Sequence, residues 1–374
     1  MAIKVSAEEL NRATLARQLL LAREQLSATE ATRRIVAIQA QHAASPYVAL
    51  WNRLVDFDPA ELDSAFAERQ LVKATLMRFT LHAVHRDDHL PFHVAMQPSL
   101  PEKYLTDRGL TRPQAHAYLP ELLEFVAEPR SSAEVEEWFT SYHGVAGKDV
   151  WWILRAFAPV CHSPTGGPWS FGQRPHFVAA SPHPAQYSDE LAATARETLV
   201  WRYLEGFGPA SLADVAQFAK IQRAHAKAAI SALGEKLVVL EGPDGSTLYD
   251  VPGAPRPAAD TPAPPRLMAM WDSALLAYAD RSRIVPAEYK SVVTRINGDV
   301  LPTLLVDGQV AGLWRSTADG IEAAAFRPLP AKTWKALSVE ASILTTFLAD
   351  REPTVYSRYN NWWSDLPAAE TRLL

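Results

Sequence analysis

The sequence predicts an α+β protein with three tandem winged-helix motifs followed by a C-terminal domain rich in β-structure. The prediction rests on two observations: an order of helices followed by a β-hairpin recurs three times, and short, regularly spaced strands come after it. The predicted domains are winged-helix repeats at residues 1–110, 111–190 and 191–255, and a C-terminal α+β domain, similar to a small β-barrel, at residues 256–374.

The first repeat is expected to begin with helices over residues 8–41. A stripe of apolar residues with helical spacing predicts the first of them. Ser27 followed by Glu30 forms a capping-box pattern and marks the start of another. A third helix over residues 59–69 leads into two alternating segments that predict a hairpin. The stripe consists of Leu15, Leu19, Ala22 and Leu26, and the hairpin strands are residues 71–76 and 79–84.

The second repeat follows the same order. Ser131, with Glu134 three residues later, opens a predicted helix over residues 131–142. A strongly apolar segment at 149–160 predicts the next helix, and the residues from 160 to 173, which include a Thr-Gly-Gly-Pro turn, are expected to form the wing.

The third repeat, residues 199–251, carries the clearest pattern. A long helix ends at a Gly-Pro break, and the next helix is capped near Ser211. After a turn, another helix starts at about Arg223, and a hairpin turns at Gly242–Gly245. This order predicts a helix-turn-helix with a wing.

The C-terminal part begins with a Pro-rich stretch, residues 251–267, which is either a linker or the lead into a strand. Three short β-rich segments follow, separated by a Gly-Asp turn and an Asp-Gly turn, and they predict a small β-rich domain or barrel. Residues 331–350 predict a final helix. The three strand segments are residues 293–297, 300–306 and 310–316.

The composition is that of an ordinary globular protein, with 48% hydrophobic and 21% charged residues. The formal net charge of −5 argues against a surface coated in positive charge but allows a basic cleft between acidic surfaces. Of the 37 basic residues, 27 are arginine and 10 are lysine. Arginine suits phosphate contacts, although GC-rich codon usage is the simpler explanation of this bias.

Cys161 is the only cysteine, so the chain has no disulfide framework and no cysteine-based zinc site. The N-terminus lacks an apolar signal core, and no run of 18 apolar residues occurs anywhere. We therefore expect a soluble cytoplasmic protein without a membrane partner.

Two pairs of segments resemble the AlkZ/YcaQ-like family of winged-helix DNA glycosylases: residues 33–54 with 71–88, and residues 270–286 with 300–315. Order, spacing and total length all match, and the resemblance covers nearly the whole chain. It implies a monofunctional glycosylase that removes N7-alkylguanines and unhooks interstrand crosslinks left by DNA-alkylating antibiotics. The catalytic signature of the family is Gln, an apolar residue, then Gln or Asp, and Gln39-Ala40-Gln41 matches it.

The identity of the second signature residue carries further information. Gln41 resembles the branch of the family that confers self-resistance to an antibiotic by removing bulky adducts. The other branch has Asp at this position, so a broader role in crosslink repair is not implied for this chain.

Glutamines suit this chemistry because alkylation at N7 makes the guanine a cationic, already activated leaving group. The glycosidic bond breaks with oxocarbenium character at C1′, so the enzyme needs only to hold a water and stabilise the developing charge. The carbonyls of Gln39 and Gln41 are the expected groups. No ionisable base is required, which predicts weak pH dependence. No lysine lies in the motif, which favours hydrolysis over a Schiff-base mechanism.

The spacing of the two glutamines raises a structural question. Residues i and i+2 lie about 200° apart on a helix, so both can face one substrate only if the helix ends or distorts there. The following segment contains Pro46, which permits such an ending. On spacing alone, Gln39 and Gln41 are better explained as polar positions at a helix end, and the resemblance of the flanking segments reverses this preference.

Arg78, Thr80 and His82 alternate in the second hairpin strand, share one face of it, and match an Arg-x-Thr-x-His pattern of the family. We expect Arg78 to contact phosphate or substrate and His82 either to support the catalytic cleft or to lie in the core. Asp280 either belongs to a DNA-contacting element or pins a loop. The other expected contacts to DNA or substrate are Tyr47, Trp51, Asn52, Arg53, Lys220, Arg223, Lys227, Arg281 and Arg283.

Several of these residues have a simpler alternative role: Trp51 in the core, and the basic residues of the third repeat on a solvated face. A metal site at His85, His89 and His93 is not expected, because Pro91 would interrupt the helix needed to align them and no carboxylate motif completes the set. No cofactor is implied.

The expected partner is double-stranded DNA that contains an alkylated guanine, and the expected state is a monomer, because one duplex fills one cleft. We expect an open cleft between the repeats, since a crosslinked guanine cannot be fully extruded into a deep pocket. The alternatives are a non-enzymatic winged-helix transcriptional regulator and a protein that sequesters an antibiotic. Three repeats in one chain and the Gln-Ala-Gln motif count against a regulator.

Overall fold

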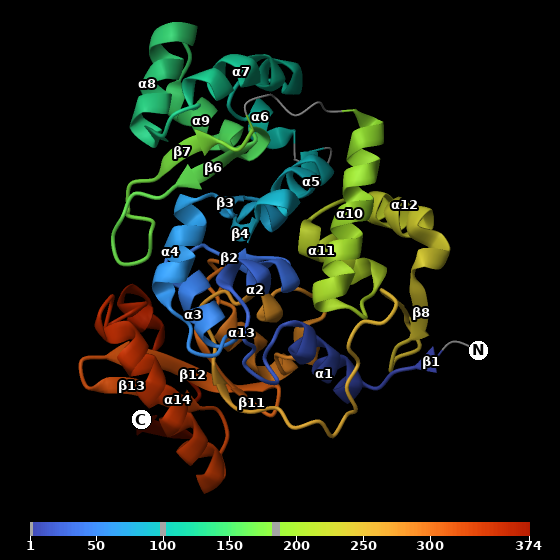
Figure 1. Cartoon of the computed structure of the whole chain (residues 1–374), viewed down its shortest axis with the longest axis vertical. Coiled ribbons are helices and arrows are strands. Elements are labelled where there is room, and N and C mark those ends of the chain that lie inside the picture. The colour runs from blue at the N-terminus through green and yellow to red at the C-terminus, as the bar shows by residue number, and fades with distance from the viewer. Residues whose placement is uncertain (1–2, 98–101, 182–187) are drawn as a thin grey trace.

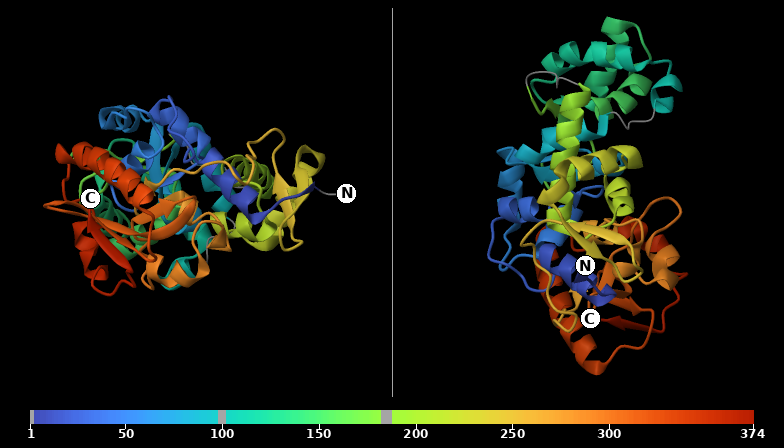
Figure 2. Two further views of the ribbon diagram at one scale, coloured as in Figure 1. Left: turned by 90° about the horizontal axis from the view of Figure 1, so that it is seen from below. Right: turned by 90° about the vertical axis from the view of Figure 1, so that its right-hand side faces the viewer.

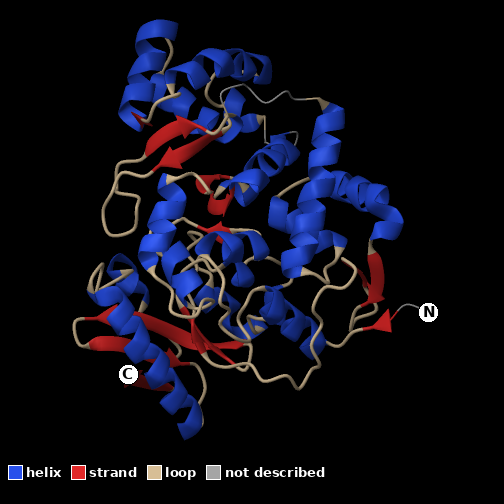
Figure 3. Cartoon of the chain, viewed as in Figure 1, coloured by secondary structure: helices blue, strands red, loops and turns tan. Residues whose placement is uncertain are grey.

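The computed structural model describes residues 3–97, 102–181 and 188–374. Helices and short strands are mixed along the chain (Figure 3), so the predicted α+β class is confirmed. The second repeat lies at one end of an elongated molecule and the C-terminal domain at the other, with the first repeat between them (Figure 1 and Figure 2). Among the described residues, no helix combines the length and apolar character that crossing a membrane requires.

The first repeat has the order of a winged helix: a helix, a short strand, two helices and a hairpin. The predicted capping box is present, since Ser27 accepts from the Glu30 amide while the Glu30 carboxylate accepts from the Ser27 amide. The elements are α2 (Ala28–Arg34), β2 (Ile38–Gln39), α3 (Ser45–Trp51), α4 (Pro59–Ala67), β3 (Leu71–Thr75) and β4 (Leu81–His85), preceded by α1 (Ala7–Arg17).

The helical character predicted for residues 8–41 is wrong in two places. Helix α1 ends at Arg17, and Leu19 has a left-handed backbone with φ 56°, although its side chain is buried. Of the apolar stripe, Leu15 and Leu19 are buried, whereas Ala22 is exposed and Leu26 is half-buried, so the helical spacing did not extend beyond α1. Helix α2 ends at Arg34 because Val36, at φ 75°, cannot continue a helix and turns the chain into β2.

The second repeat carries its wing further along the chain than predicted. The capping box at Ser131 and Glu134 is confirmed. Helix α9 ends at Phe157 rather than at residue 160, and the second strand of the wing is residues 176–179, not residues 169–173. The elements are α5 (Arg86–Met96), α6 (Lys103–Thr106), α7 (Arg112–Phe125), β5 (Arg130–Ser131), α8 (Ser132–His143), α9 (Gly147–Phe157), β6 (Val160–Ser163) and β7 (His176–Ala179).

The first two wings join into one six-stranded sheet with the order β2-β4-β3-β6-β7-β5. The junction is an antiparallel pairing of β3 with β6, in which Lys73 lies opposite His162. The sheet therefore holds the first and second repeats together and places these two side chains side by side, an arrangement that the separate hairpin predictions did not include.

The third repeat confirms the predicted helix-turn-helix and hairpin. Ser211 caps a helix through a capping box with Asp214, and the hairpin turns at Gly242–Gly245. The N-terminal strand β1 (Ile3–Lys4) extends this hairpin by pairing parallel to β8. The elements are α10 (Asp189–Phe207), α11 (Leu212–Ala219), α12 (Arg223–Leu233), β8 (Val238–Glu241) and β9 (Thr247–Asp250).

The C-terminal domain is an open antiparallel sheet in the order β10-β11-β12-β13-β14, and helix α14 contacts it. The barrel-like prediction is wrong, because β10 and β14 each have one neighbour in the pairing of the described strands. Residues 293–297 do not form a strand, because Val293 ends α13, Thr294 forms an isolated bridge with Val300, and a turn follows. The elements are β10 (Arg266–Leu267), α13 (Lys290–Val293), β11 (Thr303–Val306), β12 (Gln309–Thr317), β13 (Gly320–Ala325), α14 (Ala331–Ala349) and β14 (Glu370–Leu373).

The first repeat and the C-terminal domain share one apolar core, which includes Leu50 from α3, Leu304 from β11 and Leu337 from α14. A buried ion pair crosses the same contact, with the Arg53 guanidinium bonded twice to the Asp272 carboxylate at 2.8 and 2.9 Å. The contact fixes the first repeat relative to the C-terminal domain. The domain boundaries stay a prediction.

Candidate active site

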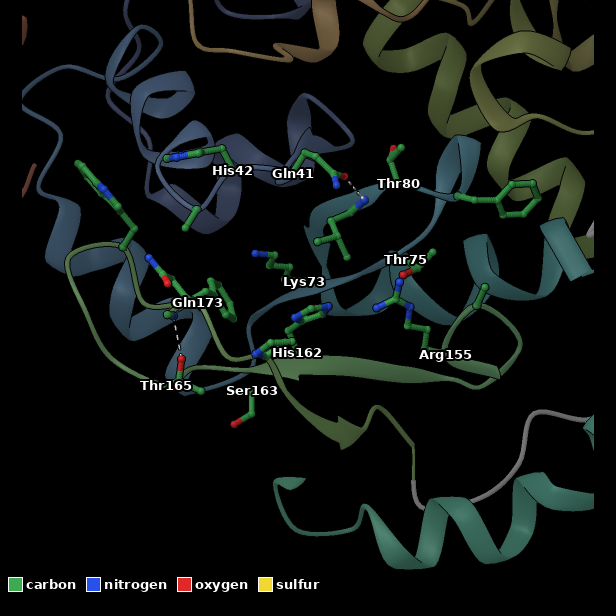
Figure 4. Close-up of a pocket in the computed structure, with 18 of the residues that line it drawn as sticks. Gln41, His42, Lys73, Thr75, Thr80, Arg155, His162, Ser163, Thr165 and Gln173 are labelled. Carbon is green, nitrogen blue, oxygen red and sulfur yellow. Dashed lines mark hydrogen bonds between the residues drawn. The ribbon is translucent and has the colours of Figure 1, made fainter. Parts of the chain in front are cut away.

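A cleft of about 920 Å³ lies between the first and second repeats, with the third repeat and the C-terminal domain at its edges. Figure 4 shows side chains from several elements around this space. The lining contains five cationic side chains and one carboxylate, whereas the whole chain has 37 basic and 42 acidic residues. The cleft therefore favours an anionic ligand despite the net charge. The cations are Lys73, Arg78, Arg155, Lys220 and Arg358, and the carboxylate is Glu352.

The Gln-Ala-Gln motif begins on a strand rather than at a helix end, and Gln41 lies at the bend that follows the strand. Gln39 is in β2 opposite His82 of β4, and the Ala40 amide continues the pairing by donating to the Leu81 carbonyl at 2.7 Å. The predicted helix end is therefore wrong, and the two glutamines do not share one exposed face, because Gln41 lines the cleft and Gln39 does not.

Gln41 is exposed and lines the cleft (Figure 4). Its Oε1 accepts from the Leu81 amide at 3.3 Å, a long hydrogen bond that a ligand can replace at little cost. The second lone pair of Oε1 and the side-chain amide group have no hydrogen bond within the described residues, so a water or a substrate in the cleft can bind to them.

Gln39 is buried behind Gln41, at 3% exposure, and is not part of the cleft lining. Its Oε1 accepts from Arg78 Nη2 at 2.8 Å, and its backbone amide donates to Ser273 Oγ at 3.2 Å. The carbonyl predicted to orient water is therefore already engaged, which limits Gln39 to holding Arg78 and the strand in place.

Arg78 is not on the predicted strand but in a 3₁₀ turn before it, with φ 56°. This backbone directs the guanidinium toward Gln39 and also toward the Phe218 carbonyl, to which Nη1 donates at 3.0 Å. Burial lowers the pKa of Arg78 to about 10, so it stays cationic at neutral pH. Thr80 lines the cleft beside it, and its Oγ1 donates to the Met77 carbonyl.

His82 is fully buried, and its hydrogen bonds define a neutral ring. Nδ1 lies 3.0 Å from the Thr80 carbonyl and Nε2 lies 3.3 Å from Arg78 Nη2. Since a carbonyl only accepts and a guanidinium only donates, Nδ1 carries the proton. Burial and the charge of Arg78 lower the pKa of His82 to about 3. His82 therefore supports Arg78 from the core, which unites the two roles expected for it.

Lys73 and His162 were missed by the sequence analysis. Lys73 is 6% exposed, its Nζ lies 4.5 Å from the centre of the Phe171 ring, and burial lowers its pKa to about 8. Burial and the charges of Lys73 and Arg155 hold the pKa of His162 well below its usual value. The alternation of Lys73 with Thr75, both in the lining, was the available signal for the lysine.

His42 follows Gln41 directly and also lines the cleft. Burial and the charges of Arg358 and Lys73 lower its pKa to about 4. Both histidines of the lining are therefore neutral and weakly basic at neutral pH, so neither is matched to general-base work there.

Four expected DNA contacts lie in the interior, and we do not retain them. The Tyr47 hydroxyl donates to Asp63 Oδ1 and forms a hydrogen bond with Ser170 Oγ at 2.7 Å, and Trp51 packs in the core. Asn52 donates to the Val48 and Leu267 carbonyls, and Arg53 pairs with Asp272. The sequence placed them beside the catalytic motif, but the fold turns Trp51, Asn52 and Arg53 toward the C-terminal domain and Tyr47 toward α4.

The basic residues of the third repeat have different positions. Lys220, at the end of α11, lines the cleft with Nζ 5.1 Å from the centre of the Phe79 ring. Arg223 and Lys227 are exposed on α12 outside the lining. Their role as backbone contacts stays a prediction.

Arg281 and Arg283 are half-buried and engaged within the protein. Arg281 donates to Thr294 Oγ1 at 3.0 Å, and Arg283 donates to the Pro209 carbonyl at 3.0 Å. Asp280 pins this turn through hydrogen bonds from Ser282 rather than through a salt bridge. A contact from either arginine to DNA stays a prediction, and neither lines the cleft.

The expectation that Pro91 would interrupt the helix needed to align His85, His89 and His93 is wrong. Pro91 lies inside α5 and does not interrupt it, and His89 and His93 stack with ring centres 6.0 Å apart. In the described part of the chain, no three potential ligands of the His, Cys, Asp and Glu types are grouped for a metal.

Comparison with known proteins gives consistent matches. The sequence profile of the family described as DNA glycosylase AlkZ-like matches residues 32–347. The interstrand DNA cross-link repair glycosylase of Streptomyces sahachiroi is 25% identical over 328 residues, which cover 80% of this chain and 84% of that relative. The solved structure of Streptomyces sahachiroi DNA glycosylase AlkZ matches with a TM-score of 0.79 at 20% identity, covering 94% of this chain and 99% of that one. This structural likeness shows a common fold.

The profile match is the decisive comparison, because it spans most of the chain. It includes Gln39 and Gln41 as well as four of the five cations of the cleft lining, all except Arg358. The chain belongs to the AlkZ-like DNA glycosylase family and is a hydrolase that acts on N-glycosyl bonds.

Proposed function

We propose that this protein hydrolyses the N-glycosidic bond of bulky N7-alkylguanines in double-stranded DNA, acts as a monomer, and protects its host from a DNA-alkylating natural product. The observation that carries the proposal is Gln41, an exposed carboxamide on the wall of a wide, cationic cleft. The Streptomyces sahachiroi relative is named for the repair of interstrand DNA crosslinks, which supports unhooking of crosslinks as a further activity.

The size of the cleft supports a bulky lesion. About 920 Å³ is at the upper end of the range for small-molecule sites, and the space extends over two repeats instead of enclosing a single base. A guanine that remains tied to the opposite strand can enter such a cleft without complete extrusion.

In the proposed reaction, the bond between C1′ and N9 breaks and its electron pair passes to the guanine, which neutralises the charge at N7. Gln41 holds a water beside C1′ through its carbonyl, and the carbonyl dipole stabilises the oxocarbenium-like sugar. The water adds to C1′ and loses a proton to solvent. Gln39 is a positioning residue that acts through Arg78 and strand β2.

The test is base release from duplex DNA that contains a defined N7-alkylguanine, with a small methyl adduct and a bulky adduct compared. We expect Gln41→Ala to lower kcat by about 10²–10³, as loss of one group that stabilises transition-state charge does. We expect Gln39→Ala to lower kcat by about tenfold with KM unchanged.

Gln173→Ala is the matched control, because Gln173 is an exposed glutamine in the lining of the same cleft. It should leave base release unchanged. Equal losses in Gln173→Ala and Gln41→Ala would contradict the special role of the motif. If the wild-type protein bound the DNA but released neither the methylated nor the bulky N7-alkylguanine, the proposal that N7-alkylguanines are its substrates would be wrong.

A further inference from the structure

Two exposed aromatic side chains face the cleft from the second repeat. Tyr104 in α6 is 37% exposed and Trp152 in α9 is 46% exposed, and both belong to the cleft lining. Their ring centres lie 6.4 Å apart at an interplanar angle of 79°. We call this pair the aromatic shelf. Exposed aromatic side chains of this size, gathered in a cleft, commonly mark a binding surface.

The packing of α9 does not require a tryptophan at position 152. Trp151, Ile153 and Leu154 are buried and provide the apolar face that packs into the second repeat. A polar residue at position 152 would complete the amphipathic pattern at no cost to the core. The tryptophan is thus additional to what folding demands.

Two arginines accompany the shelf. The Arg108 guanidinium lies 4.1 Å from the centre of a Trp152 ring, and that of Arg155 lies 5.8 Å from it. Within the described residues neither forms an ion pair with a carboxylate, and Arg108 Nε is buried without a hydrogen-bond partner. Aromatic rings beside cations that are not neutralised are the combination by which proteins hold unpaired nucleic-acid bases and their phosphates.

We propose that the aromatic shelf is a stacking site for a neutral, flat aromatic ring, on the wall of the cleft supplied by the second repeat. Gln41 lies on the wall supplied by the first repeat, so the shelf holds a group other than the reacting base. The cationic N7-alkylguanine itself is disfavoured beside two guanidinium groups. The inference rests on the proposed function, because it assigns this ring to damaged DNA.

Two sources can supply such a ring: an unpaired base near the lesion, or an aromatic group carried by the adduct. The experiment measures the dissociation constant for three duplexes that contain 2′-fluoro sugars at the lesion, which prevents cleavage. One duplex is unmodified, one carries N7-methylguanine and one carries N7-benzylguanine. Binding is then read without any dependence on base release.

We expect Trp152→Ala to weaken binding of at least one lesion duplex about tenfold, and Trp152→Phe to restore most of it. A loss confined to the benzyl adduct assigns the ring to the adduct. An equal loss for both lesions, absent from the unmodified duplex, assigns it to an unpaired base. Tyr142→Ala is the matched control, because Tyr142 is 79% exposed on α8 and outside the lining.

The proposal is overturned if Trp152→Ala changes none of the three dissociation constants by more than about twofold while its Tm matches that of the wild type. It is also overturned if Tyr142→Ala has the same effect as Trp152→Ala. A failure of the proposed function is separate, since the wild-type protein would then release no base while its binding constants are still measurable.

Discussion

The cleft and the contact between the first repeat and the C-terminal domain are both rich in cationic side chains, but the two regions use the charge differently. At the contact, Arg53 pairs with Asp272 and Arg351 pairs with Asp63. In the cleft, none of the five lining cations pairs with a carboxylate among the described residues. Paired arginines hold the fold together, whereas cations without carboxylate partners are available to a polyanion.

The largest effect is expected from Arg53→Ala. It leaves the buried Asp272 carboxylate without its cation and should lower the free energy of unfolding by about 3–5 kcal/mol. Chemical denaturation measures this. Arg315→Ala removes an ion pair that is partly exposed, with Glu322, and should cost less than about 1 kcal/mol. If the two variants were equally stable, the buried pair would not have the role that its geometry indicates.

The sequence predicts the parts of the fold that depend on residues close together in the chain and misses the parts that join distant segments. The capping boxes at Ser27 and Ser131 were visible because each joins residues three apart in the chain, and the cap near Ser211 was visible as well. The joining of β3 with β6 and the pairing of Arg53 with Asp272 connect distant segments, and no local pattern encodes them.

The candidate site was predictable to the same extent. The resemblance located Gln39 and Gln41, but only the turn at Val36 explains why Gln39 lies on a strand and not on a helix. Arg53 looked like a DNA contact because it is basic and close to the motif, and its partner lies 219 residues away. Lys73 was overlooked because its neighbour His162 comes from the second repeat, which the local sequence around Lys73 does not reveal.

The cleft should show an intermediate effect through Lys73. Because its pKa is lowered to about 8, its ammonium group is charged at pH 7 and loses its proton as the pH rises through 8. We expect the dissociation constant for duplex DNA to rise about tenfold between pH 7 and pH 9, as expected for the loss of one charged contact. The chemical step should stay flat over this range, because Gln41 does not titrate.

Binding measured by fluorescence anisotropy at constant salt tests this expectation. Lys73→Met should bind weakly at both pH values and lose the pH dependence, while Lys73→Arg should bind tightly at both. A pH dependence that persists in Lys73→Met would assign the titration to another group, and the comparison of cleft with contact would then rest on a different cation.

The smallest effect is expected outside both regions, at the exposed face of α12. Arg223 and Lys227 have neither a carboxylate partner among the described residues nor a place in the cleft lining, so the comparison predicts only weak contact with DNA. Arg223→Ala should raise the dissociation constant about twofold and leave the slope of log Kd against log salt nearly unchanged. Arg358→Ala, in the cleft, should reduce that slope by about 0.9.

If Arg223→Ala reduced the slope by a full unit, the duplex would have to extend from the cleft onto α12. In that case the third repeat would bind phosphate through this helix, as its helix-turn-helix order predicts, and the DNA-binding surface would be wider than the cleft alone.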